Sequence, residues 1–177
     1  MGFAKFAKSR LTTQGSRLIQ KQRHVLIMHQ NLQTKIYFLS AFLVSFAVNP
    51  IFFRLYRDSK NFVLNCDYFG GLIIGNSYLI ISLVFLVLVI YFGFRSKSYI
   101  ESIGFGILVG GGIWNIIQRV GDNCVYDYFK LGPIYNLTLY FNVSDALIWL
   151  GLLLLLTTFI QACIKTPLST KSIDVKR

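Results

Sequence analysis

The sequence predicts an all-α membrane protein with four transmembrane helices, and three observations lead to this fold class. Hydrophobic residues make up 54% of the 177-residue chain, above the roughly 45–50% that is usual in soluble domains, and the mean hydropathy is +0.56. The apolar residues form four runs near or above the ~20 residues that cross a bilayer. None of these runs shows strict alternation, so in lipid only a helix satisfies their backbone. The predicted spans are 36–53, 72–94, 99–117 and 137–164.

The four spans differ in how clearly their boundaries are marked. The second and fourth are long and uninterrupted. The apolar run of the first is interrupted by Asn49-Pro50, and the third begins beside Glu101 and ends in a cluster of glycines, so both are less clearly marked. Residues 1–35 form a basic tail, either helical on the membrane surface or disordered. Residues 165–177 form a second basic tail.

The distribution of basic residues predicts the orientation of the chain. The sequence has 18 Lys and Arg residues against seven Asp and Glu. Thirteen of the 18 fall in the two tails and in the link between the second and third spans, and five fall on the other side. The positive-inside rule therefore places both termini in the cytoplasm. A nucleic-acid partner is disfavoured, since the basic residues are spread over three segments without a recognisable binding module.

Two further features leave alternatives open. Within the first run, Ser45-Phe46-Ala47 places small residues after a basic region and an apolar core, as at a signal-peptide cleavage site. The basic region of 35 residues is far longer than usual, so we expect the span to be retained. Cys66 and Cys124 both lie in outer segments, where a disulfide can form but is not required by the sequence. The three cysteines and two histidines are not spaced as metal ligands.

Polar residues concentrate between the end of the third span and the start of the fourth. Asn115 and Arg119 lie one turn apart, with Gln118 beside them, so they share a helical face. Asn142 and Asp145 are three residues apart at the start of the fourth span, and Asp127 lies in the intervening polar segment. The chain has only seven acidic residues, and two of them, Asp127 and Asp145, lie near this membrane boundary. Their presence there indicates a reaction centre at the outer face.

Each of these residues also has a simpler interpretation. Asp145 can cap the fourth helix, since Asp is a favoured N-cap residue. Asp127 alone is an ordinary loop aspartate, and Arg119 alone is a cation that reaches the interface. The three consecutive glycines from 110 to 112 allow either close approach of another backbone or loose helix packing.

The order and spacing of these residues resemble a known family. Gly111-Gly112-x-x-Asn115-x-x-x-Arg119 ends one span, Val125-Tyr126-Asp127-Tyr128 follows, and Phe141-Asn142-Val143-Ser144-Asp145-Ala146 opens the next. This pattern is similar to that of the lipoprotein signal peptidases, the type II signal peptidases of bacteria. The resemblance covers residues 36–164.

The resemblance implies a function for the chain. Its members are multi-pass aspartyl endopeptidases of the bacterial cytoplasmic membrane, which cleave the signal peptide of a prolipoprotein just before a diacylglyceryl-modified cysteine. It implies that Asp127 and Asp145 are the catalytic aspartates, and that Asn115, Arg119 and Asn142 bind the substrate and orient them. Metal ions and organic cofactors are not expected. The expected partners are lipidated prolipoproteins and membrane lipids, bound by a monomer.

Three departures from the family pattern keep other functions open. Gln118 stands where the family has an aspartate, Asn49-Pro50 stands where it has Asp-Gln, and the block at Asn65 is one residue short. A homologue that binds signal helices without cleaving them is therefore one alternative. A small structural or transport-linked membrane protein, whose aspartates serve packing or ion coordination, is another.

Overall fold

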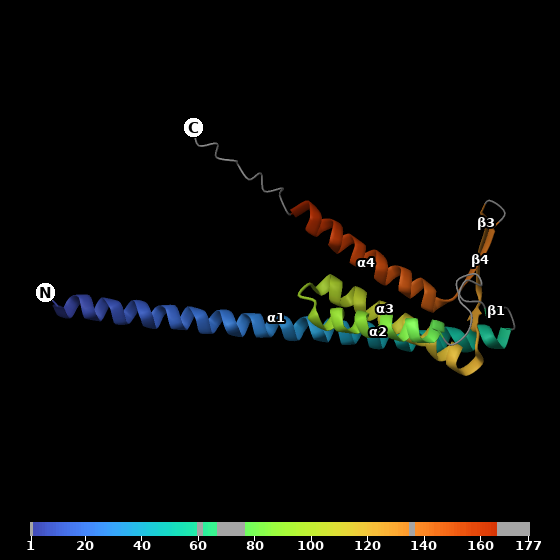
Figure 1. The fold of residues 1–177 in the computed structure, drawn as a ribbon, viewed down its shortest axis with the longest axis horizontal. Helices are drawn as coiled ribbons and strands as arrows, with labels where there is room; N and C mark the ends of the chain where they lie inside the picture. Colours follow the sequence, from blue (N-terminus) through green and yellow to red (C-terminus); the bar gives the residue numbers. More distant parts are fainter. Residues whose placement is uncertain (1, 60–61, 67–76, 135–136, 166–177) are drawn as a thin grey trace, which may run out of the picture.

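The computed structural model describes residues 2–59, 62–66, 77–134 and 137–165, in which four helices carry short strands at one end (Figure 1). The helices are α1 (Gly2–Ser59), α2 (Ser77–Arg95), α3 (Tyr99–Asp122) and α4 (Val143–Lys165). Segments of α1, α3 and α4 are long and apolar enough to cross a membrane, and α2 contains a shorter apolar stretch. Four apolar helices were predicted and are present. Residues 72–76 of the second predicted span lie outside the described residues.

Helix α1 continues through Asn49-Pro50, which interrupt the apolar run, and ends at Ser59, beyond the predicted end of the first span at residue 53. A proline inside a helix costs about 3 kcal/mol, since it removes a hydrogen bond and crowds the preceding turn. Aromatic contacts after Pro50 oppose this cost: the Phe52 ring lies against Phe129, and the Phe53 ring lies against Tyr126. The basic tail, left open between helix and disorder, is helical from Gly2 and continuous with the span.

The all-α expectation is also wrong outside the spans, where the chain forms two small antiparallel sheets. In the first, β1 (Val63–Asn65) pairs with β2 (Val125–Asp127). In the second, β3 (Phe129–Ile134) pairs with β4 (Leu137–Phe141). The predicted fourth span of 137–164 therefore begins as a strand. Residues 137–141 are rich in residue types that suit a strand, and their pairing with β3 prevails over their hydropathy.

Helix α3 is the centre of the bundle and packs against each of the other three helices. Its glycines allow this close approach. A Cβ at Gly106 would clash with the carbonyl oxygen of Phe38 in α1, and a Cβ at Gly110 would clash with the Ser45 hydroxyl. On another side, a Cβ at Gly111 would lie 2.7 Å from the carbonyl oxygen of Ser144 in α4. Two of the three consecutive glycines thus serve close backbone approach, which was one of the two interpretations.

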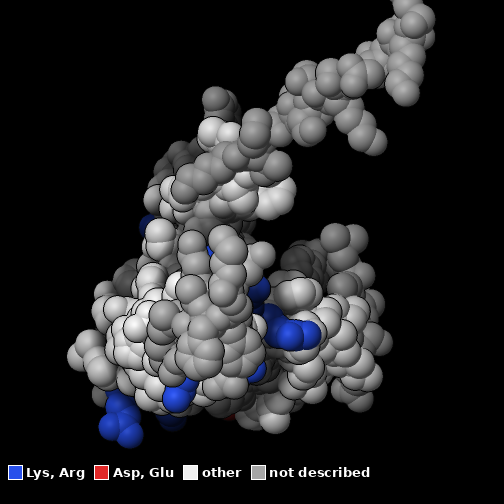
Figure 2. All heavy atoms as spheres, turned by 90° about the vertical axis from the view of Figure 1, so that its left-hand side faces the viewer, with Lys and Arg blue, Asp and Glu red and all other residues white. Residues whose placement is uncertain are grey.

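The strands lie at one end of the bundle, and the beginning of α1 and the end of α4 extend beyond the other (Figure 1). Viewed from that second end, Lys and Arg side chains project from the molecule and acidic side chains are scarcely visible (Figure 2). At the strand end, Cys66 and Cys124 form a disulfide, which resolves the alternative that the sequence left open. The bond joins the end of β1 to the start of β2 and holds the first sheet against α3.

Candidate active site

Asp127 is the last residue of β2 and is held by two asparagine amides. Alternation along β2 turns Val125 and Asp127 inward, and each is only 2% exposed. Asn65 of β1 pairs opposite Val125, so its side chain lies on the same face of the sheet as Asp127. The Nδ2 of Asn65 donates to Oδ2 of Asp127 at 3.0 Å, and Nδ2 of Asn142 donates to Oδ1 at 2.9 Å.

Asp145 is the third residue of α4 and takes part in a reciprocal helix cap. Its backbone N–H donates to Oδ1 of Asn142 at 3.0 Å, and the backbone N–H of Asn142 donates to Oδ2 of Asp145 at 3.2 Å. This is a capping box with Asn142 as the N-cap. The simpler interpretation of Asp145 as the cap itself is therefore wrong. The other carboxylate oxygen, Oδ1, accepts a hydrogen bond from Nδ2 of Asn115 at 2.8 Å.

Asn142 connects the two aspartates. Its side-chain oxygen binds the backbone of Asp145, while its side-chain nitrogen binds the carboxylate of Asp127. The residue is 1% exposed, so water does not compete for these bonds. One buried amide therefore fixes the start of α4 relative to the end of β2, and with it the placement of one carboxylate relative to the other.

Burial and hydrogen bonding act in opposite directions on the pKa of Asp127. Burial raises the pKa of Asp127 above its ordinary value, because a carboxylate loses its hydration in the interior. The hydrogen bond from Asn65 opposes this shift, and the nearby negative charge of Asp145 adds to it. The buried guanidinium of Arg119 lowers the same pKa, and its charge also acts on Asp145. The net direction for Asp127 is upward, which favours its protonated form.

The five residues predicted for the site, Asp127, Asp145, Asn115, Arg119 and Asn142, are brought together by the fold. Sequence analysis missed Asn65 as a member, because its block departs from the family pattern. The signal that could have identified it is the adjacent Cys66, whose disulfide partner Cys124 lies just before β2. The bond places Asn65 beside the strand that carries Asp127.

The residues that depart from the family pattern also make buried hydrogen bonds. Asn49 is 0% exposed; its Oδ1 accepts from the Ser144 hydroxyl at 2.7 Å, and its Nδ2 donates to the carbonyl of Ser45 at 2.8 Å. Oε1 of Gln118 accepts from the backbone N–H of Tyr126 at 3.2 Å. Both amides provide the acceptor that a carboxylate would offer, without adding a charge.

Tyr128 satisfies the first backbone group of α4. The N–H of Val143 has no partner within the helix, and it donates to the Tyr128 hydroxyl at 3.2 Å. The Tyr128 ring stacks on Tyr56 of α1, with centroids 4.7 Å apart and planes within 8°. This stacking links the helical segment after Pro50 to the start of α4.

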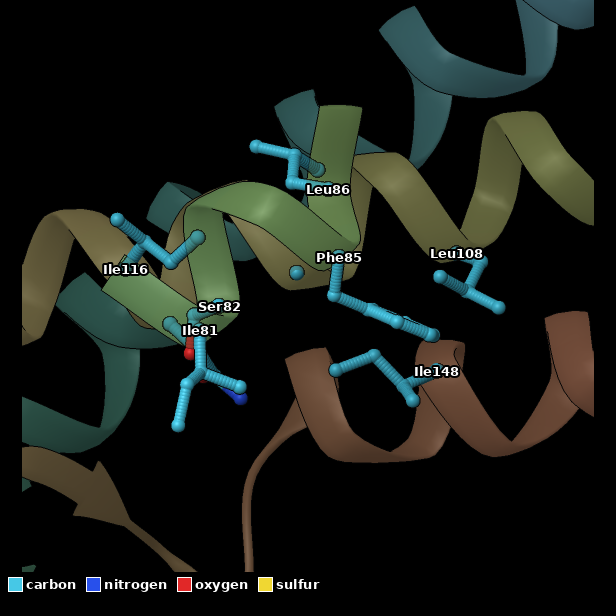
Figure 3. Close-up of a pocket in the computed structure, with 9 residues that line it drawn as sticks. Ile81, Ser82, Phe85, Leu86, Leu108, Ile116 and Ile148 are labelled. Carbon is cyan, nitrogen blue, oxygen red and sulfur yellow. The ribbon is translucent and has the colours of Figure 1, made fainter. Parts of the chain in front are cut away.

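An apolar pocket of about 370 Å³ adjoins the aspartates between α2, α3 and α4. Figure 3 shows Phe85 of α2 and Ile148 of α4 pointing toward one another across it. Asn115 lines this pocket and also binds Asp145. Its Oδ1 is buried and has no hydrogen-bond partner among the described residues. The pocket thus joins an apolar wall to an amide with an available acceptor.

The helical bundle thus contains two carboxyl groups that are held by amides. An arginine and an apolar pocket lie beside them. The sequence model of the signal peptidase (SPase) II family, Peptidase A8, matches residues 25–161. The chain belongs to the signal peptidase II family.

Three relatives of this signal peptidase II family member bear the name lipoprotein signal peptidase. The protein of Caldicellulosiruptor bescii is 29% identical over 79 residues, which are 44% of this chain and 53% of the relative. That of Syntrophomonas wolfei is 35% identical over 97 residues, 51% of this chain and 61% of the relative. That of Rhodopseudomonas palustris is 37% identical over 67 residues, 35% of this chain and 40% of the relative. The matched segments thus span roughly half the length of these relatives.

The fold of the chain is similar to solved structures of a bacterial membrane enzyme. One has a TM-score of 0.60 at 17% identity, with 78% of this chain and 94% of the other covered. A second also has a TM-score of 0.60 at 17% identity and covers 70% and 92% of the two chains. The chains therefore share the helical membrane fold although few of their residues are identical.

Proposed function

We propose that the chain is a lipoprotein signal peptidase, a membrane aspartyl endopeptidase that removes the signal peptide of a prolipoprotein just before its diacylglyceryl-modified cysteine. The single observation that carries this proposal is the bridge made by Asn142 between Asp127 and Asp145. A helix cap alone requires Asn142 and Asp145. It does not require a second buried carboxyl group held by the same amide.

The two carboxyl groups divide the acid and base roles. Burial raises the pKa of Asp127 and so favours its protonated form, which can polarise the scissile carbonyl by donating a hydrogen bond. Two carboxyl groups so close share one proton, and we assign the ionised role to Asp145, because the helix dipole and a backbone N–H in the first turn of α4 stabilise an anion there. Asp145 takes a proton from the attacking water as the oxygen bonds to the carbonyl carbon. That proton then passes to the leaving amide nitrogen when the peptide bond breaks.

Asn115 and Arg119 bind the substrate beside the carboxyl groups. Asn115 offers its unpartnered Oδ1 to a substrate N–H. Arg119 supplies positive charge next to the carbonyl, where negative charge develops as the water attacks. The apolar pocket that Asn115 lines accepts the hydrophobic part of the substrate. The water is activated by the aspartates, so this mechanism uses no metal or organic cofactor.

The cellular setting follows from the same proposal. The protein is a monomer in the bacterial cytoplasmic membrane, with both termini in the cytoplasm and the aspartates at the outer face. Its substrates and the surrounding lipids reach the site laterally between the helices. The distribution of basic residues supports this orientation, because 13 of the 18 lie on the side of the two termini.

Expression in a bacterial host that lacks its own signal peptidase II tests the proposal. The full chain should convert a lipidated prolipoprotein to the faster-migrating mature form on a gel. Asp127→Asn and Asp145→Asn should each lower the rate by roughly 10²–10⁴-fold, the usual contribution of a general acid or base.

Two other outcomes would contradict the proposal in different ways. Binding of the prolipoprotein without cleavage by the unsubstituted chain would identify a homologue that has lost catalysis. Cleavage that survives both substitutions would remove the aspartates from the mechanism. Membrane levels of each variant, measured on the same gels, distinguish loss of chemistry from loss of folding.

A further inference from the structure

We propose that Glu101 binds the basic amino-terminal region of the substrate's signal peptide, at the far end of a groove that begins at the aspartates. This inference rests on the proposed function and deepens it. It assigns a second pocket of the bundle to a particular part of the substrate, and it names the side chain that distinguishes basic from neutral signal peptides.

We use the word groove for the space over α3 between α2 and α4, in which two separate pockets lie. Both helices pack on α3 and make far less contact with each other. Its first part is the pocket beside Asn115. Its second part is a pocket of about 400 Å³ lined by the same three helices, with Phe92 from α2, Phe105 from α3 and Phe159 from α4. Figure 1 shows α4 leading away from the rest of the bundle toward its C-terminal end.

The two pockets are separated by the length of a signal-peptide helix. Asn115 and Glu101 lie 14 positions apart on α3, which corresponds to about 21 Å at the helical rise of ~1.5 Å per residue. The apolar region of a signal peptide has 7–15 residues and spans about 10–22 Å as a helix. A substrate whose cleavage site lies at the aspartates therefore places the start of its longer apolar regions level with Glu101.

Charge complementarity identifies the part of the substrate that binds there. The segment before the apolar region of a signal peptide carries Lys or Arg. Glu101 is the single glutamate of the sequence, and it is the acidic side chain that lines the second pocket. A lysine or arginine can lay its apolar stem along the phenylalanine walls and bring its charge to the carboxylate.

The position of Glu101 is not explained by helix capping. Ser98 and Glu101 match the pattern of a capping box at the start of α3, but Ser98 makes no side-chain cap. Its backbone N–H donates to the Ser96 hydroxyl at 3.2 Å instead of to Glu101. The Ser96 hydroxyl in turn donates to Oε2 of Glu101 at 2.8 Å, which orients the carboxylate at the pocket.

The neighbouring cation is engaged elsewhere. Arg95 also lines this pocket, but its Nε and Nη2 both donate to the hydroxyl of Tyr91 at 3.3 Å, and its guanidinium lies over the Tyr91 ring. These contacts leave the positive charge of Arg95 in place but hold its guanidinium at Tyr91, so the carboxylate of Glu101 stays available to an arriving basic residue.

Cleavage of two synthetic substrates by the full chain in lipid vesicles tests the proposal. Both substrates are diacylglyceryl-modified signal peptides with the same apolar region; one has two lysines before it and the other has two glutamines. Glu101→Gln keeps the acceptor for Ser96 and removes the charge. It should lower kcat/KM for the lysine substrate about three- to fivefold, mainly through KM, and leave the glutamine substrate unchanged. High salt should reduce the difference.

Two further variants make the outcome decisive. Glu101→Lys should reverse the preference, so that a substrate with two glutamates is cleaved better than the lysine substrate. Asp122→Asn, which removes one charge at the other end of α3, should leave the preference as it is. An equal change for both substrates, as expected if a phospholipid fills the pocket, would overturn the proposal, and so would no change for either. Failure of the unsubstituted chain to cleave any substrate would instead count against the proposed function.

Discussion

At the scale of single residues, the site depends on asparagine. The four oxygens of the two carboxyl groups each accept one N–H, from the side chains of Asn65, Asn115 and Asn142 and from the backbone of Asn142. A neutral amide can hold either protonation state of a carboxyl group, because its hydrogen bond does not require a full charge on the acceptor. This suits a pair of groups that must pass through different protonation states during one reaction.

Substitution of Asn142 separates its role as a helix cap from its role as a bridge. Serine is an equally good N-cap and alanine is a poor one, but neither donates to Asp127 as asparagine does. We expect Asn142→Ser and Asn142→Ala to lose cleavage to the same extent. They should differ in stability by about 1 kcal/mol, which appears as a higher unfolding temperature of the serine variant in detergent. Retained cleavage in the serine variant would show that the bridge to Asp127 is dispensable.

The sequence was sufficient to predict the five polar residues but not the partner from β1. Asn115, Arg119, Asp127, Asn142 and Asp145 fall within 31 positions, and their spacing follows a recognisable pattern. Asn65 lies 62 positions from Asp127, and only the pairing of two three-residue strands brings them together. Pairing across such a distance leaves no periodic signal in so short a segment.

At the scale of the elements, one local pattern had two different outcomes. An acidic residue three positions after a candidate cap occurs at the start of both α3 and α4. In α4 the box closes, because Asn142 and Asp145 bind each other. In α3 it stays open, because Ser96 supplies the hydrogen bonds for both Ser98 and Glu101. Sequence spacing defines which partners are within reach, and a third side chain decides which pair forms.

The boundaries of the fourth span failed for a related reason. Hydropathy alone cannot distinguish residues 137–141 from the helix that follows, since both are apolar. The boundary is set by Asn142, which follows the last residue of β4 and whose side chain accepts a hydrogen bond from a free backbone N–H in the first turn of α4. The helix of the first span ends later than predicted, because the aromatic partners that stabilise it after Pro50 come from distant segments.

The consecutive glycines of α3 should respond differently to the same substitution. Gly110→Ala places a methyl group against Ser45 of α1, and such overpacking costs typically about 1–3 kcal/mol. A Cβ at Gly112 meets nothing within 4 Å, so Gly112→Ala should stabilise the helix by up to about 1 kcal/mol. Thermal unfolding of the two variants in detergent measures both effects. If both were destabilised equally, the contact between α1 and α3 would not depend on Gly110.

At the scale of the whole molecule, the helices and the distribution of charge agree on one arrangement. The end of α2 and the start of α3 lie beside the middle of α1, since Tyr99 donates to Gln33 at 3.0 Å and the ring of Phe38 lies against Phe94. The start of α1 extends beyond them (Figure 1). The strands and the aspartates lie at the other end. The sequence predicted which segments lie at which end, because the positive-inside rule needs only the number of basic residues in each segment and no knowledge of how the helices pack.

The orientation of this arrangement can be tested through the free cysteine. Cys163 lies near the end of α4, is exposed, and is the one cysteine outside the disulfide. With the C-terminus in the cytoplasm, a membrane-impermeant maleimide should label Cys163 only after the membrane is permeabilised. Cys163→Ser should abolish the label, and Lys130→Cys in that background should be labelled in intact cells. Labelling of Cys163 in intact cells would reverse the orientation.

The disulfide also imposes an order on the making of the protein. Cys66 precedes α2 and Cys124 follows α3, so the bond closes a 58-residue separation that contains both helices. It can form only after this helical hairpin has been synthesised and both of its ends have met the same oxidising compartment. Asn65, next to Cys66, reaches Asp127 as a result of that closure. Completion of the proposed active site is thereby coupled to completed insertion, and a chain still passing through the membrane lacks a finished site.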